Sequence, residues 1–67
     1  MKYAVKVFDT RGTMYRAQIP YGTLEEARTQ YDSEQLYGRF MRAELWSGSF
    51  TNETWTDSEM LASKVKS

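Results

Sequence analysis

The sequence predicts a small α+β domain, with a three- or four-stranded antiparallel sheet and one helix packed on one of its faces. Two observations lead to this class. Residues typical of half-buried strands occur along Tyr3–Phe8 and Phe40–Trp46. A capping box at Thr23–Glu26 opens a helical pattern between them. The length of 67 residues allows one hydrophobic core, so residues 1–67 are expected to form a single domain.

The N-terminal segment is expected to form a β-hairpin. Tyr3–Phe8 is rich in β-branched and aromatic residues, which favour strands. Asp9–Gly12 has the composition of a turn, because Asp suits the first turn position and Gly tolerates a positive φ. Thr13–Ile19 is predicted as the second strand. Pro20 cannot donate a hydrogen bond to a ladder, so it ends that strand or places it at an edge.

The central segment is predicted to be a helix over residues 24–33. The Thr23 hydroxyl can accept a hydrogen bond from the third helical N–H, and Glu26 can reach back to the cap. The stripe expected to be buried consists of Leu24, Ala27 and Tyr31. Polar residues follow this stripe and predict an irregular exit. The alternative is a helix that continues to residue 37 and stops at Gly38.

The C-terminal third leaves two interpretations open. Phe40–Trp46 is predicted as the third strand, followed by a turn at Ser47–Ser49 and a short fourth strand at Phe50–Thr54. Thr56–Val65 is predicted as a helix, because Thr56 and Glu59 form a second capping box, with Trp55 and Met60 as the flanking apolar staple. The alternative is an extended segment that pairs with the third strand.

The connections predict the strand order 2-1-3, with the first strand central. The helix returns the chain along the second strand, and a right-handed crossover then places the third strand beside the first and antiparallel to it. Side chains alternate across each strand. The face expected to receive the helix consists of Tyr3, Val5, Val7, Tyr15, Ala17, Ile19, Met41, Ala43 and Leu45.

The opposite face, called here the helix-free face, mixes large apolar side chains with cations. The candidate binding residues on it are Lys6, Phe8, Met14, Arg16, Phe40, Arg42 and Trp46. Aromatic residues, Met and Arg are enriched at protein interfaces, so a protein-binding or dimerisation surface is one interpretation. A second is an internal face covered by Trp55, Met60 and Leu61. A third is a platform on which single-stranded nucleic acid stacks.

Composition argues against several classes of chemistry. The chain has no Cys and no His, so it lacks a thiolate nucleophile, an imidazole base and the usual zinc ligands. The glycines match no phosphate-binding motif, and no nucleophile has a base at a suitable spacing. We therefore expect no enzymatic activity, no cofactor and no metal site. Nine basic and nine acidic residues give a net charge of zero, which weighs against binding nucleic acid by charge alone.

Charge is nevertheless divided along the chain. Residues 1–20 hold four basic residues and one acidic residue, whereas residues 21–36 hold one basic residue and four acidic residues. We expect a basic hairpin and an acidic helix surface. The sequence has no apolar run of about 20 residues and no apolar region typical of a signal peptide, so a cytoplasmic location without membrane contact is expected.

Two stretches carry a resemblance to a group of known proteins. Thr23–Ala27 gives the helix start Thr-Leu-Glu-Glu-Ala, and Gly38–Trp46 gives a glycine followed by a strand that ends in an acid and apolar residues. This layout resembles that of small phage and prophage accessory proteins, such as anti-CRISPR proteins and other host-takeover inhibitors. The resemblance implies a protein in the host cytoplasm that binds a host protein complex and blocks it. The chain itself is expected to be a monomer or a homodimer.

Overall fold

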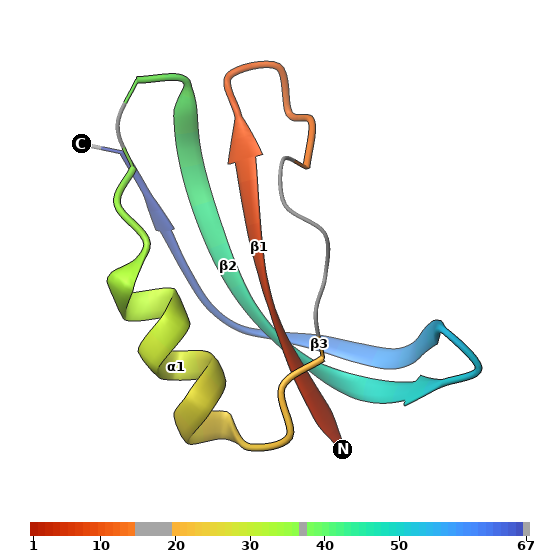
Figure 1. Cartoon of the computed structure of the whole chain (residues 1–67). Helices are drawn as coiled ribbons and strands as arrows, with labels where there is room; N and C mark the ends of the chain where they lie inside the picture. Colours follow the sequence, from red (N-terminus) through yellow and green to blue (C-terminus); the bar gives the residue numbers. More distant parts are fainter. Residues whose placement is uncertain (15–19, 37, 67) are drawn as a thin grey trace.

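A computed structural model of the chain describes residues 1–14, 20–36 and 38–66. Its elements follow the order β1 (Lys2–Asp9), α1 (Leu24–Ser33), β2 (Phe40–Thr51) and β3 (Thr54–Val65). The three strands form one antiparallel sheet in the order β1-β2-β3, and α1 packs on one face of it (Figure 1). The predicted α+β class, with an antiparallel sheet and one helix, is confirmed.

The turn after β1 forms as its composition predicts. The Asp9 carboxylate accepts hydrogen bonds from the backbone N–H groups of Arg11 at 2.9 Å and Thr13 at 3.0 Å. Gly12 has a φ of 81°, a left-handed conformation that glycine adopts without a steric penalty. The Asp and the Gly therefore each have the role in the turn that their chemistry suggests.

The predicted strand order 2-1-3 is not confirmed. The expected second strand, Thr13–Ile19, lies mostly outside the described residues, although bridges join Met14 to Phe8 and Tyr21 to Tyr3. The antiparallel pairing of the first strand with the strand that begins at Phe40 is confirmed. The central strand of the three is β2, because the C-terminal segment adds a strand along its other edge.

α1 occupies the predicted range and begins at the predicted cap. The Thr23 hydroxyl oxygen accepts a hydrogen bond from the Glu26 N–H at 3.2 Å, and the hydroxyl donates to the Glu26 carboxylate at 3.2 Å. Ala27 and Tyr31 are buried, as predicted, whereas Leu24 in the first turn is 39% exposed. The buried stripe of the helix is therefore shorter than its sequence pattern suggests.

The helix predicted over Thr56–Val65 is wrong, and the extended alternative is confirmed. These residues belong to β3, which pairs with β2 through a two-residue turn. In that turn Asn52 and Glu53 have φ values of 52° and 62°. Positive φ at both positions is typical of a type I′ turn, whose twist matches that of paired strands. As a strand, the segment also satisfies backbone groups of β2 that a helix would leave unpaired.

The predicted turn at Ser47–Ser49 and the separate fourth strand at Phe50–Thr54 are also wrong, because β2 continues to Thr51. Gly48 instead allows β3 to pack closely against β2. A Cβ atom at this position would lie 3.1 Å from Cε3 of Trp55 and 3.2 Å from the Thr56 carbonyl oxygen. The small residue therefore allows β3 and its indole to approach the β2 backbone closely.

Phe40 lies on the face opposite to the one predicted. Phe8 pairs with Arg42, but the next residue, Asp9, pairs with Phe40, so Met41 is the extra residue of a β-bulge. Met41 is 39% exposed, and Phe40 packs against the core, on the face of the sheet that carries α1. The predictions for both residues fail for the same reason, because a bulge interrupts the two-residue alternation of a strand.

The core lies between α1 and the sheet. Its buried members are Val5, Val7, Ala27, Tyr31, Ala43 and Leu45. The strand residues in this list were all predicted to face the helix. The other predicted members Tyr15, Ala17 and Ile19 lie outside the described residues.

Lys64 of β3 closes the C-terminal end of α1. Its ammonium group donates hydrogen bonds to the carbonyl oxygens of Tyr31 at 2.7 Å and Glu34 at 2.8 Å, and lies 4.8 Å from the centroid of the Tyr31 ring. A cation is favourable there because the last carbonyl groups of a helix are unpaired and partly negative. Burial raises the pKa of the Tyr31 hydroxyl, and the nearby Asp32 carboxylate adds to this shift.

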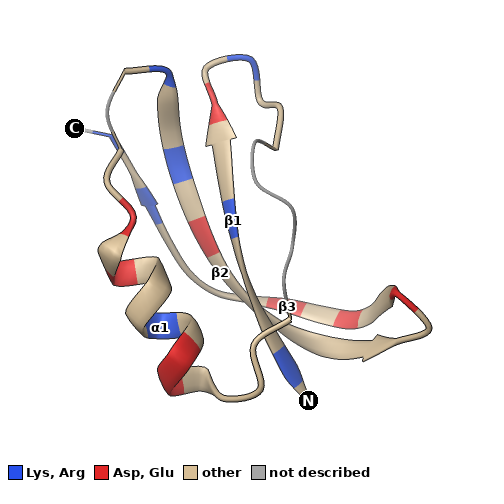
Figure 2. Cartoon of the chain, in the orientation of Figure 1, with Lys and Arg blue, Asp and Glu red and all other residues tan. Residues whose placement is uncertain are grey.

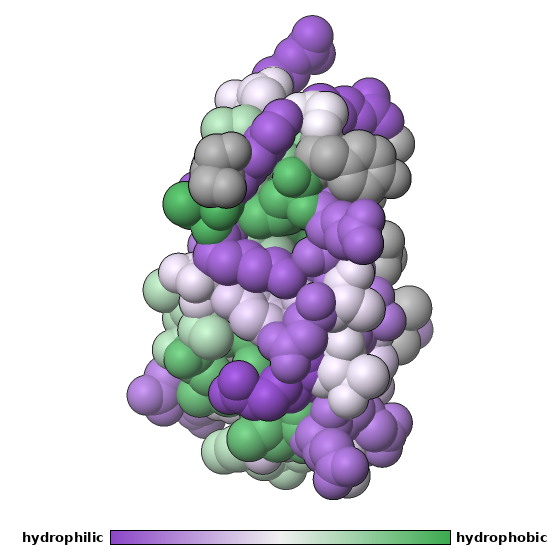
Figure 3. Space-filling view, turned by 90° about the vertical axis from the view of Figure 1, so that its left-hand side faces the viewer, coloured by the Kyte–Doolittle hydropathy of each residue, from purple (hydrophilic) through white to green (hydrophobic). Residues whose placement is uncertain are grey.

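Figure 3 views the molecule from the left-hand side of Figure 1, where α1 lies. Hydrophilic residues predominate on this side, and apolar residues form separate patches between them. Within the described part of the chain, no helix is long and apolar enough to cross a membrane.

Candidate functional site

The helix-free face is built from alternate residues of all three strands. Phe8 lies opposite Arg42 and Lys6 lies opposite Glu44, so β1 and β2 place cations and rings side by side. Alternation and pairing give this face the described members Lys2, Ala4, Lys6, Phe8, Arg42, Glu44, Trp46, Gly48, Phe50, Trp55, Met60, Ser63 and Val65.

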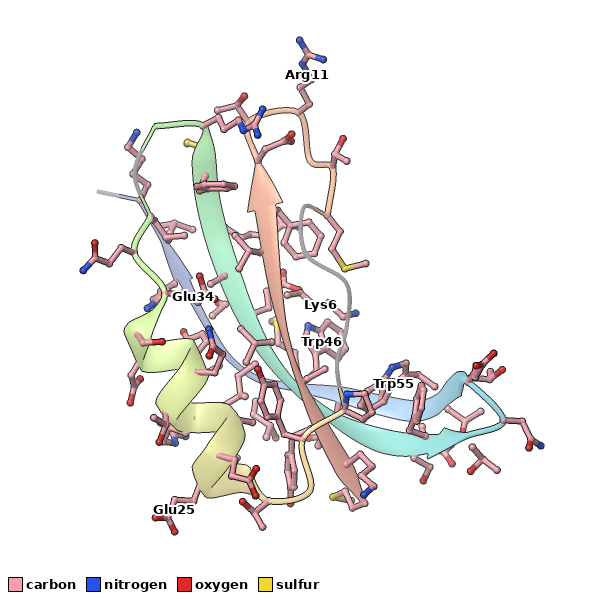
Figure 4. The ribbon with its side chains drawn as sticks, in the orientation of Figure 1. Lys6, Arg11, Glu25, Glu34, Trp46 and Trp55 are labelled. Carbon is pink, nitrogen blue, oxygen red and sulfur yellow. The ribbon has the colours of Figure 1, made fainter. Side chains whose placement is uncertain are left out.

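Five side chains at the centre of this face form a continuous series of contacts, called here the central cluster. The Arg42 guanidinium carbon lies 4.3 Å from the centroid of the Phe8 ring, and Arg42 Nε pairs with Glu44 Oε2 at 2.9 Å. Trp46 Nε1 donates a hydrogen bond to Glu44 Oε1 at 2.8 Å. Lys6 Nζ lies 4.2 Å from the centroid of the Trp46 ring, and the two side chains are adjacent in Figure 4.

Glu44 organises the central cluster. Its side chain is 13% exposed, against 45% for Arg42, and each of its carboxylate oxygens has one of these partners. The alternation of side chains along the strand places Glu44 on this face, but Glu44 was not among the candidate binding residues. The signal was the order Arg42, Glu44, Trp46 at same-face spacing, which puts one carboxylate between a guanidinium and an indole N–H.

Apolar side chains with large exposed fractions lie around the central cluster. Met60 pairs with Trp46 and is 47% exposed, while Val65 pairs with Arg42 and is 69% exposed. Met14 joins the margin through its bridge to Phe8 and is 42% exposed. Sequence reasoning missed Val65 and counted Met60 only as a covering residue, because both were assigned to a helix.

The structure therefore brings only some of the candidate binding residues together. Four of them, Lys6, Phe8, Arg42 and Trp46, come together in the central cluster. Met14 lies at its margin. Phe40 lies on the other side of the sheet, packed against the core. Arg16 lies outside the described residues.

β3 extends the sheet sideways and does not fold across the helix-free face. Trp55 packs beside Gly48 and against Phe50, with 5.1 Å between the two ring centroids. Met60 and Leu61, which the internal interpretation placed as a cover, are 47% and 42% exposed. The covering arrangement of Trp55, Met60 and Leu61 is thus not the one that the chain adopts.

The charge on this face is positive. Its described members include the cations Lys2, Lys6 and Arg42, and the single carboxylate Glu44. Acidic residues gather elsewhere, along α1 and on the distal part of the β2–β3 hairpin (Figure 2). On the hairpin these are Glu53, Asp57 and Glu59, with no basic residue between positions 47 and 63. The molecule therefore presents surfaces of opposite charge.

Within residues 1–14, 20–36 and 38–66, no three carboxylate groups are close enough together to hold a metal ion. Comparison with known proteins finds no matching family model, no similar curated protein and no similar solved structure.

Proposed function

We propose that the chain is a non-catalytic protein-binding module that engages its partner through the helix-free face. The observation that carries this proposal is the central cluster, in which Arg42, Trp46 and Phe8 are linked and part-exposed beside the exposed Met60 and Val65. Trp and Arg are the residue types that most often dominate the energy of protein interfaces. Methionine side chains adapt to the shape of a partner, which suits the margin of such a site.

The contacts within the cluster favour binding in a second way. Arg42 is held by Phe8 and Glu44, and Trp46 is held by Glu44 and Lys6. Side chains that are ordered before binding lose less conformational entropy on binding, by about 0.5–1.5 kcal/mol for each flexible side chain. A preformed cluster therefore supports an interface better than the same residues without mutual contacts.

The same geometry favours a protein partner over single-stranded nucleic acid. A base would stack on the face of an aromatic ring, but Lys6 already lies over Trp46 and Arg42 over Phe8. Glu44 also places a carboxylate among the cations, where it opposes a phosphate. These contacts would have to break before a base could use the covered faces of either ring.

A homodimer is also less well supported. Two helix-free faces brought together would place cations against cations. Pairing through the outer edge of β3 meets two register irregularities, between Leu45 and Trp46 and between Ser47 and Ser49. Bulges of this kind discourage edge-to-edge association of strands.

The form of protein binding that we propose is blockade of a protein complex in the cytoplasm. This is how the phage accessory proteins that the sequence resembles act. Such a role needs a stable binding surface and no reacting group, which agrees with a chain that lacks Cys and His.

Affinity capture from the producing cells tests this proposal when it is done with surface variants. Arg42→Ala and Val65→Glu change exposed side chains of the helix-free face, and Arg11→Ala is the control, since Arg11 projects from the turn after β1 (Figure 4). We expect a protein that binds the wild type and the control at equal levels and is lost from both face variants. Thermal unfolding of each variant shows whether the fold persists. A captured protein that is retained by both folded face variants would contradict the proposal.

A further inference from the structure

We infer that the partner presents an acidic, partly apolar segment to the helix-free face, with a carboxylate bound by Arg42. This inference rests on the proposed function and adds the chemistry of the partner. It follows from the donors that the central cluster leaves unused, from the charge of the face and from the position of its exposed apolar residues.

Arg42 has the donors that a carboxylate requires. Its Nε pairs with Glu44, while its two Nη groups make no hydrogen bond to any described residue, and the side chain is 45% exposed. The Phe8 ring beneath the guanidinium restricts its orientation. Two parallel N–H donors of a guanidinium match the two oxygens of a carboxylate, and such bidentate pairs are stronger than neutral hydrogen bonds.

The remaining charges of the face point to the same chemistry. Lys6 lies over Trp46 and has no ion pair with a described residue, and Lys2 is exposed on the same side of β1. Glu44 is the one carboxylate among the described members of the face, and Arg42 and Trp46 already use both of its oxygens. A basic partner would therefore meet uncompensated cations, whereas an acidic partner would neutralise them.

Apolar residues lie beside these cations, which sets the pattern expected in the partner. Val65 is paired with Arg42, and Met60 is paired with Trp46 across β2 and β3. A segment whose acidic side chains alternate with large apolar side chains would bury the exposed parts of both residues while its carboxylates reach Arg42 and Lys6. A second copy of this face lacks that pattern, because it brings the same excess of cations.

Selection from a displayed library of random dodecapeptides on the immobilised full chain tests the inference. We expect selected peptides to be enriched in Asp and Glu next to Leu, Ile, Phe or Trp. A synthetic peptide made from the selected consensus should lose about ten- to a hundredfold in affinity with Arg42→Gln. It should bind more weakly to Lys2→Glu, which reverses one charge at the margin. Arg11→Glu, the same charge change away from the face, should leave its affinity unchanged.

The outcomes separate this inference from the proposed function. Selected peptides that are neutral or basic, but that still lose affinity with Val65→Glu, would overturn the acidic partner and leave protein binding at this face standing. Failure to select peptides, or peptides whose affinity is unchanged by both Val65→Glu and Arg42→Gln, would overturn both. Micromolar binding of a single-stranded oligothymidine that is weakened by Lys2→Glu would reassign the face to nucleic acid.

Discussion

Single residues determine which side chains lie on each face of this sheet. Sequence alternation correctly brought together Lys6, Phe8, Arg42 and Trp46, because these positions lie where the pairing of β1 with β2 is regular. It failed at Phe40, one position beyond the bulge at Met41. A bulge depends on how two strands meet, and neither strand's own sequence specifies it. Glu44 could have been recognised as a site residue only by asking which partner its carboxylate would need on a half-buried surface.

Gly48 provides a test at this scale. In Gly48→Ala the new Cβ would lie 3.0 Å from Ser58 Oγ, 3.1 Å from Trp55 Cε3 and 3.2 Å from the Thr56 carbonyl oxygen. Because one of these neighbours is backbone, we expect β3 to shift and the free energy of unfolding to fall by about 1–3 kcal/mol. Denaturant unfolding measures this loss. Gly22→Ala is the matched control, since nothing lies within 4 Å of its Cβ position. Equal stability of the two variants would refute the close approach of β3 to Gly48.

The raised pKa of Tyr31 predicts that the free energy of unfolding falls at alkaline pH. Burial, followed by the charge of Asp32, raises the pKa of its hydroxyl above the ordinary value of about 10. The unfolded chain therefore releases this proton at a lower pH than the folded chain. The contribution of Tyr31 is fully present below about pH 10 and is lost as the pH rises through the folded pKa. Denaturant unfolding between about pH 8 and pH 11 should show a steeper loss for the wild type than for Tyr31→Phe. Parallel curves for the two proteins would show that Tyr31 makes no such contribution.

Among the secondary-structure elements, the sequence correctly predicted α1, because local signals mark both its start and its end. Thr23 and Glu26 fixed the start of α1, and the polar residues after Tyr31 fixed its end at Ser33. The same capping pattern at Thr56 was misleading, because the unpaired edge of β2 made a strand more favourable than a helix. The turn that follows the start of β2 was also predicted at the wrong place, Ser47–Ser49. Asn52, between two segments of strand composition, was a better indicator than the glycine at position 48.

The turn between β2 and β3 gives a prediction at this scale. Glu53 has a φ of 62°, which costs a residue with a side chain more than it costs glycine. We expect Glu53→Gly to raise the free energy of unfolding by about 0.5–1 kcal/mol. Glu53→Gln removes the charge but keeps the steric demand, so it should behave like the wild type. Urea unfolding compares the three proteins. A Glu53→Gly protein no more stable than Glu53→Gln would argue against the type I′ turn.

For the whole molecule, the sequence predicted the class of fold and the existence of a mixed apolar and basic face. It did not predict how open that face is, because exposure depends on whether residues 54–65 cross the sheet or extend it. With β3 in the sheet, the cations of the helix-free face lie apart from the acids of α1 and of the distal hairpin (Figure 2). We propose that this separation of charge lets one surface of a chain with zero net charge select an acidic partner.

Site-specific photo-cross-linking in the producing cells tests whether the helix-free face binds another protein. A photoreactive phenylalanine analogue replaces Val65, which is 69% exposed on the helix-free face, or Glu25, which projects from α1 away from the sheet (Figure 4). We expect a discrete covalent adduct to another protein from position 65 and none from position 25. Adducts from position 25 alone, adducts to nucleic acid from position 65, or the absence of a protein adduct at position 65 would contradict it.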